Sequence, residues 1–158
     1  FLTEALTLCQ QLGIEVHMPE ILRSLAQVSI KRGQLSEALD RAHQALELAS
    51  GMQHRELGNG YRTLGIVYRE LERYEDAETH LRKSLEVFDQ QGNLYESGLT
   101  LIELGLLFAA QVGHVPNGDA VRVQGTVYCD QAILNFEKIG AVKHLMRAQE
   151  IRRSLQAT

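Results

Sequence analysis

Tryptophan is missing from the sequence, and proline and cysteine are scarce, with two residues of each. So few prolines leave little to interrupt helices, and the many Leu, Ala, Glu, Gln and Arg residues favour an all-helical chain. Cys9 and Cys129 lie far apart in sequence, which favours two free, buried thiols over a disulfide. Free thiols suit a reducing compartment, so we expect a cytoplasmic protein.

Long hydrophobic runs and an excess of basic residues are also missing. No apolar run approaches the ~18 residues of a membrane span, and no signal peptide is recognisable, so we expect no membrane association. Lys and Arg total 16 against 20 Asp and Glu, and the net charge of −4 argues against direct nucleic-acid binding. The chain opens on Phe1 inside a helical pattern, and we therefore expect it to be a piece of a longer protein.

Catalytic and metal-binding patterns are lacking too. Neither HExxH nor GxSxG occurs, and Asn59 between Gly58 and Gly60 has no GxxxxGK pattern around it. We therefore predict that the protein is not an enzyme and holds no cofactor and no metal. The histidines are scattered over separate segments: His17, His43, His54, His80, His114 and His144.

One stretch, residues 61–85, organises the rest of the sequence. It reads as two antiparallel helices joined by a tight turn, with bulky residues on one face of each. Small residues stand where the two backbones would have to approach each other. The bulky positions are Tyr61, Leu64, Tyr68, Tyr74, Leu81 and Leu85, and the small ones are Gly65, Ala77 and Ser84.

The same pattern recurs along the chain. Ala5, Ala45, Ser84 and Ala132 take equivalent places at intervals of about 40 residues, with roughly eight residues inserted before the last. Three of the four are followed by a glycine where a helix C-cap needs a left-handed residue. These glycines are Gly13, Gly92 and Gly140.

This spacing resembles the tetratricopeptide repeat. The period exceeds the usual ~34 residues, so the chain is similar to the long-repeat variant of bacterial signal-transducing regulators, kinesin light chains and some spindle-orientation adaptors. The resemblance implies an all-α fold: a right-handed α-solenoid of antiparallel helix pairs, a superhelix of about eight helices. It also implies a binding module.

The repeats divide residues 1–158, taken as a single domain, into five parts. Within them we predict that Ser36 caps the helix 36–50, and that Arg152, at the place of Gly65, faces water. The parts are an orphan second helix at 1–13, repeats at 18–51, 53–91 and 93–139, the last with a loop insertion at 112–119, and a capping helix at 141–157.

The resemblance predicts a concave groove built from the first helix of each repeat. We expect a protein-interaction scaffold within a larger bacterial regulatory protein, which binds an acidic or amphipathic partner segment through Arg23, Arg62 and Arg69. The alternative is that these arginines are merely solvated. The groove positions are Arg23, Gln27, Lys31, Asn59, Arg62, Ile66, Arg69, Leu99, Ile102 and Leu106.

The apolar groove positions of the third repeat leave two hypotheses open. Either Leu99, Ile102 and Leu106 are packed beneath the last helix, or they form an apolar pocket. A pocket would favour the alternative function, a ligand- or peptide-sensing module of a transcriptional regulator. A homodimer through the exposed N-terminal helix is also expected.

Overall fold

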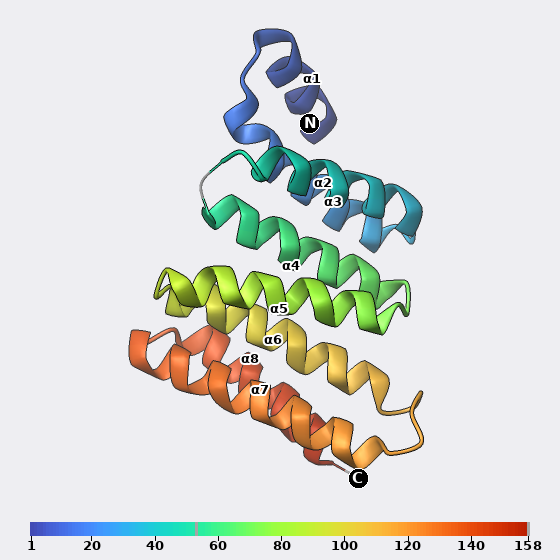
Figure 1. The fold of residues 1–158 in the computed structure, drawn as a ribbon, viewed down its shortest axis with the longest axis vertical. Coiled ribbons are helices and arrows are strands. Elements are labelled where there is room, and N and C mark those ends of the chain that lie inside the picture. Colours follow the sequence, from blue (N-terminus) through green and yellow to red (C-terminus); the bar gives the residue numbers. More distant parts are fainter. Residues whose placement is uncertain (53, 158) are drawn as a thin grey trace. The chain divides into compact units, whose positions relative to one another are not determined.

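The computed structural model describes residues 1–52 and 54–157, and within them the fold is all-α (Figure 1). The predicted fold class, an α-solenoid of helix pairs, is confirmed. Gln53, where the second predicted repeat begins, and Thr158 lie outside the described residues. The elements are α1 (Leu2–Leu12), the 3₁₀ helix η1 (Glu15–His17), α2 (Met18–Lys31), α3 (Leu35–Ala49), α4 (His54–Glu70), α5 (Tyr74–Gln90), α6 (Leu94–Gln111), α7 (Gly118–Ile139) and α8 (Val142–Gln156).

The helices group into two compact units, Phe1–Val87 and Phe88–Thr158. In the first unit α2 packs on α3, α3 on α4, and α2 also on α4, while α1 contacts α2. In the second unit α6 packs on α7, and α8 contacts both of them. Within each unit, a first helix is therefore flanked by the second helix of its own pair and by the next first helix.

A glycine lets α4 and α5 pack closely. A Cβ atom at Gly65 would lie 2.5 Å from Leu81 Cγ and 3.2 Å from the carbonyl oxygen of Ala77. Both neighbours are completely buried. The second unit repeats this arrangement, since a Cβ at Gly105 would lie 2.7 Å from Cys129 Sγ. The prediction that small residues mark close helix contacts is confirmed.

Helix ends follow the glycine pattern of the sequence. Gly13, Gly92 and Gly140 all have positive φ angles, of 66°, 62° and 68°, as the C-cap prediction requires. In the turn between α4 and α5 the left-handed place is taken by Glu72, with φ 59°. A side chain at this backbone conformation costs roughly 1–2 kcal/mol relative to a right-handed one.

Two helix starts differ from the predictions. The prediction that Ser36 caps this helix is wrong. Helix α3 begins at Leu35, with Gln34 at the N-cap position and no hydrogen bond from a capping side chain. The predicted loop 112–119 ends early, because Asn117 caps α7 by accepting a hydrogen bond from the Ala120 amide at 3.4 Å. Gly118 and Asp119 are therefore helical.

The α8 arginines do not all face water. Arg152 is half-buried, and its Nε lies 2.7 Å from Asp130 Oδ1 on α7, although the two are not aligned as a hydrogen bond. The prediction that Arg152 faces water is thus only partly correct, because its side chain is half-covered. Its neighbour Arg153 is exposed. At the other end, α1 has no buried residue, and Leu8 and Leu12 are more than half exposed.

In the part of the chain that the structure describes, the helices are too short or too polar to cross a membrane.

Candidate interaction surface

The structure brings seven of the ten predicted groove residues onto two helices that pack against each other. Arg23, Gln27 and Lys31 lie on α2, and the other four lie on α4. We call this surface the α2–α4 face; its members are Arg23, Gln27, Lys31, Asn59, Arg62, Ile66 and Arg69. The remaining three predicted residues lie on α6, in the second unit.

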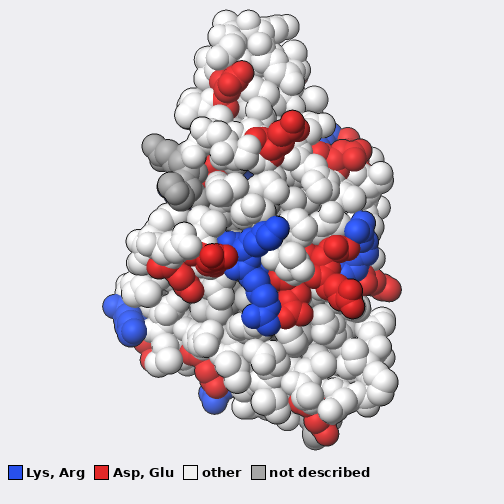
Figure 2. All heavy atoms as spheres, in the orientation of Figure 1, with Lys and Arg blue, Asp and Glu red and all other residues white. Residues whose placement is uncertain are grey.

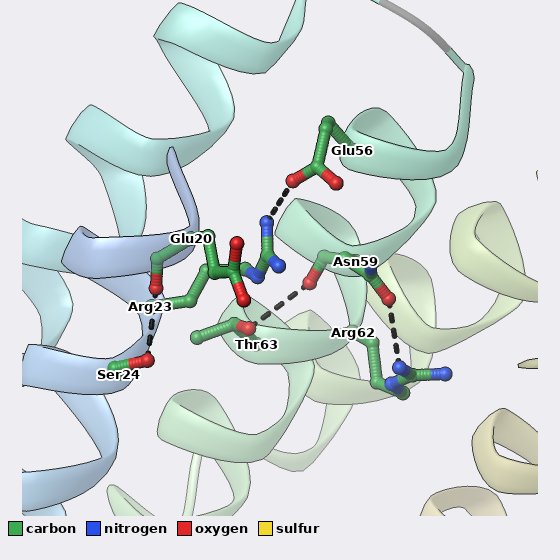
Figure 3. A network of polar contacts seen from close by, with 7 residues as sticks. All are labelled: Glu20, Arg23, Ser24, Glu56, Asn59, Arg62 and Thr63. Atoms are coloured by element: carbon green, nitrogen blue, oxygen red, sulfur yellow. Dashed lines mark hydrogen bonds and ion pairs between the residues drawn. The ribbon is translucent and has the colours of Figure 1, made fainter. Parts of the chain in front are cut away.

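Arg23 joins the two helices of the face. Its Nη1 donates to Glu56 Oε2 in a short ion pair, and Figure 3 shows the side chain reaching from α2 toward Glu56 on α4. The two side chains are only 14% and 25% exposed. A guanidinium carries five N–H donors, so Arg23 keeps donors for a ligand beyond the one given to Glu56.

The other two predicted arginines also have partners within the chain. Arg62 Nη2 donates to Asn59 Oδ1 at 2.7 Å, and Arg69 Nη2 donates to Glu70 Oε1 at 3.2 Å. Together with the acidic partners Glu56 and Glu70, the α2–α4 face therefore forms a network of mixed charge, and neither a purely basic groove nor a row of freely solvated arginines. Gln27 and Lys31 are exposed at its edge.

Glu56, an acidic member of this network, was not among the residues predicted from the sequence. A signal for it exists, because Glu56 precedes Asn59 by one helical turn and so shares a face with it. Glu20 stands in the same relation to Arg23 on α2. Both acidic residues come in the first turn of their helix, where the helix dipole favours a negative charge.

Next to the network the surface is hollowed. The hollow has a volume of about 390 Å³, and its lining holds two apolar side chains, two carboxylates and a histidine. It adjoins the α2–α4 face through Glu56, the partner of Arg23. Its lining residues are Val16, His17, Glu20, Met52 and Glu56.

The three predicted groove residues of α6 differ in exposure. Ile102 is completely buried, whereas Leu99 and Leu106 are half-buried. Ile102 is thus part of the core, and its side chain is closed to a ligand. In the same unit α8 packs on α6.

The outer face of α5 offers a contrast to the α2–α4 face. Figure 2 shows Lys and Arg interleaved with Asp and Glu over this helix. Arg82 pairs with Glu78 at 2.6 Å, and the two side chains are 55% and 30% exposed. Such pairs contribute little to stability, and Arg82 and Lys83 are exposed.

Few side chains in the described part of the chain are arranged for catalysis or metal binding. Its residues hold no cluster of three or more His, Cys, Asp or Glu side chains suited to a metal. Burial, helped by the negative charge of Asp130 and opposed by Arg152, raises the pKa of Cys129 to about 11. Its thiol is therefore neutral at physiological pH and is no nucleophile.

Comparisons with known proteins agree with this architecture. The structure is similar to the crystal structure of BtubC (BKLC) from P. vanneervenii, with a TM-score of 0.63 and 16% sequence identity. The similarity covers 99% of this chain and 72% of that one, and at this identity it shows the fold alone. A search of curated proteins gave no match.

The sequence of residues 17–90, from η1 to the end of α5, matches the family model described as tetratricopeptide repeat. This segment contains every residue of the α2–α4 face. Repeats of this family generally mediate protein–protein interactions and form non-enzymatic scaffolds. Residues 17–90 are therefore similar to tetratricopeptide repeats in sequence, and the fold of the chain agrees with that similarity.

Proposed function

We propose that the protein is an interaction module that binds a segment of a partner protein on its α2–α4 face. The observation that carries this proposal is the polar network itself. Arg23, Asn59 and Arg62 stand on two packed helices and are largely covered, and Glu56, the partner of Arg23, lines a hollow together with Val16 and Met52. Partly buried polar groups next to a hollow with some apolar lining are typical of sites that recognise a ligand.

The chemistry of the face favours an amphipathic segment with an acidic group. Apolar side chains would pack against Val16 and Met52 in the hollow. A carboxylate would take the donors that Arg23 does not give to Glu56, and charge-assisted hydrogen bonds of this kind are among the stronger ones. Glu20 and Glu56 make a purely acidic partner less suitable than one of mixed character.

From the resemblance of the repeats, we further propose that the module works inside a larger bacterial regulatory protein in the cytoplasm. The alternative, a ligand-sensing module with an apolar pocket at Ile102 and Leu106, has less support because Ile102 is completely buried. Pairing of two copies through α1 stays a prediction, motivated by the exposed Leu8 and Leu12.

The test is a selection from a library of random displayed peptides, followed by affinity measurements on the synthesised peptides. The variant Arg62→Glu/Arg69→Glu reverses two charges on the α2–α4 face. We expect it to bind the selected peptides about tenfold more weakly or worse, since lost charged hydrogen bonds have effects of this size.

The matched control is Arg82→Glu/Lys83→Glu, which makes the same change of charge on the outer face of α5. Both variants must keep the wild-type helix content by circular dichroism. The proposal is wrong if the wild type selects no peptide, or if the two variants lose affinity equally.

A further inference from the structure

The second helices of the repeats, α3, α5 and α7, can be compared position by position, because Ala45, Ser84 and Ala132 take equivalent places. Three positions are polar or acidic in both α3 and α5 but apolar in α7. In α3 they are Ser36, Asp40 and Glu47, in α5 Glu75, Thr79 and Glu86, and in α7 Val123, Val127 and Leu134. We call the last three residues the α7 stripe.

The α7 stripe is exposed along its whole length. Val123, Val127 and Leu134 are 65%, 41% and 54% exposed, and they follow one another at about one and then about two helical turns, on one side of the helix. In Figure 2 the surface at the place of α7 is mostly uncharged, unlike that over α5. The same positions are exposed on α3 and α5, each of which is followed by further helices. The place of α7 in the chain therefore does not explain the exposed stripe, and apolar side chains gathered in this way mark an interaction surface.

One end of the stripe is hollowed. A hollow of about 440 Å³ is lined by Val123 and Val127 of α7 and by Leu155 near the end of α8, with polar groups around them. At the other end of the stripe stands Leu134, a bulky apolar side chain that a hollow of this size can hold. The polar lining residues are Asp119, Arg122, Thr126 and Gln156.

A two-fold pairing of two copies brings each hollow to a leucine. When two α7 helices lie antiparallel about a point between Tyr128 and Cys129, Val123 of each copy comes opposite Leu134 of the other. A two-fold axis makes both contacts at once, because an isologous interface uses the same surface on each copy. The stripe is therefore complementary to itself in this register.

The charges of α7 agree with the same register. Asp119 of one copy comes opposite Lys138 of the other, and both side chains are exposed. Near the middle, Val127 comes opposite Asp130, whose Oδ1 already lies 2.7 Å from Arg152 Nε in its own copy. The pairing thus joins opposite charges at its two ends and buries no carboxylate without a cation beside it.

We propose that two copies of this chain pair through an antiparallel contact of their α7 helices, with Leu134 of each copy in the hollow beside Val123 of the other. The contact extends over about 30 Å of one helix in each copy, so the pairing is weaker than that of an obligate dimer. The α7 stripe shares no residue with the α2–α4 face, and the inference does not rest on the proposed function. It also differs from a pairing through α1.

The first test is sedimentation of the 158-residue protein over a series of concentrations. The wild type should form dimers at high concentration. In Val127→Glu/Leu134→Glu the association constant should fall at least about 100-fold, because each charge replaces an apolar contact twice in the pair. The matched control is Leu8→Glu/Leu12→Glu, which makes the same change at exposed positions of α1 and should associate like the wild type. Both variants must keep the wild-type helix content by circular dichroism.

The second test concerns the register. Val123→Lys and Leu134→Glu are made in separate copies, and each variant alone should stay monomeric, since a charge then faces an apolar side chain. In a mixture of the two, the new lysine comes opposite the new glutamate, while Leu134 of the first copy still meets Val123 of the second. The mixture should therefore form dimers, which a parallel pairing would not allow.

The inference is overturned if the wild type stays monomeric at the highest concentration reached, in which case the α7 stripe is left to another protein. It is also overturned if the α7 variant pairs as well as the wild type, or if the α1 variant alone loses pairing. A mixture that associates no better than its two components overturns the antiparallel register. None of these results affects the proposed function, which is tested by peptide binding.

Discussion

Replacing Gly65 with alanine tests the close packing of α4 on α5. The new methyl group would lie 2.5 Å from Leu81 Cγ and 3.2 Å from the Ala77 carbonyl oxygen, well inside the ~3.5–4.0 Å of an ordinary carbon contact. One of these neighbours is a backbone atom, so relief requires the helices to move apart. Alanine gains about 1 kcal/mol in helix propensity over glycine. Overpacking of a filled core costs about 1–3 kcal/mol. We expect a net loss of about 1 kcal/mol in the free energy of unfolding.

Denaturant unfolding followed by circular dichroism measures this loss of stability. The same substitution made in the Leu81→Ala variant tests whether the loss comes from the contact with Leu81. In Leu81→Ala the two side-chain atoms that would lie 2.5 and 2.7 Å from the new methyl group are gone, and only the contact with the Ala77 carbonyl oxygen at 3.2 Å remains, which a shift of a few tenths of an ångström relieves. There Gly65→Ala should stabilise the protein by about 1 kcal/mol, its helix-propensity gain. The coupling between the two sites is then about 2 kcal/mol, well above the scatter of independent sites. An equal effect of Gly65→Ala in both backgrounds would refute the packing described for this helix pair.

Three further changes have defined outcomes. Glu56→Gln should lower stability by about 1 kcal/mol, because its ion pair is largely covered, whereas Glu78→Gln on the exposed face of α5 should cost less than about 0.5 kcal/mol in the same denaturation assay. Cys129, with its pKa raised from 9.0 to about 11, contributes stability that is fully present below pH 9 and lost as the pH rises toward 11. Cys129→Ala should therefore flatten the alkaline loss by about 2 kcal/mol, and a thiol reagent at neutral pH should modify Cys9 alone in the folded protein. Glu72→Gly should raise the melting temperature, with a gain of about 0.5–1 kcal/mol, because glycine adopts the left-handed conformation without strain; an unchanged or lower value contradicts this.

The features that followed from local packing could be predicted from the sequence. Gly65 was identified because two helix backbones leave no room for a side chain, and the structure repeats this close contact at Gly105. Gly13 and Gly140 were identified because a C-cap requires a positive φ. Each of these constraints acts on one position of the repeat. The residue type that it requires therefore recurs along the sequence at a fixed spacing.

The features that depend on how two distant helices are aligned could not be predicted in this way. The partner of Arg23 is 33 residues away, and only the register of α2 against α4 decides that Glu56 meets it. Similarly, the spacing placed Ile102 and Leu106 on one face, but packing buries the first completely and leaves the second half-buried. The repeat spacing thus predicted which residues lie together on α2 and α4, but it did not predict the residues with which they pair.

The central claim is that a partner peptide lies along α2 and α4. The most direct test is to map a selected peptide by NMR, following the backbone amide signals of the protein during titration. Signals around Gln27, Asn59 and Ile66 should shift together with one affinity, while those on the outer face of α5, such as Glu78 and Arg82, should not move. Shifts confined to the outer face of α5, or to α7 and α8, would contradict the claim.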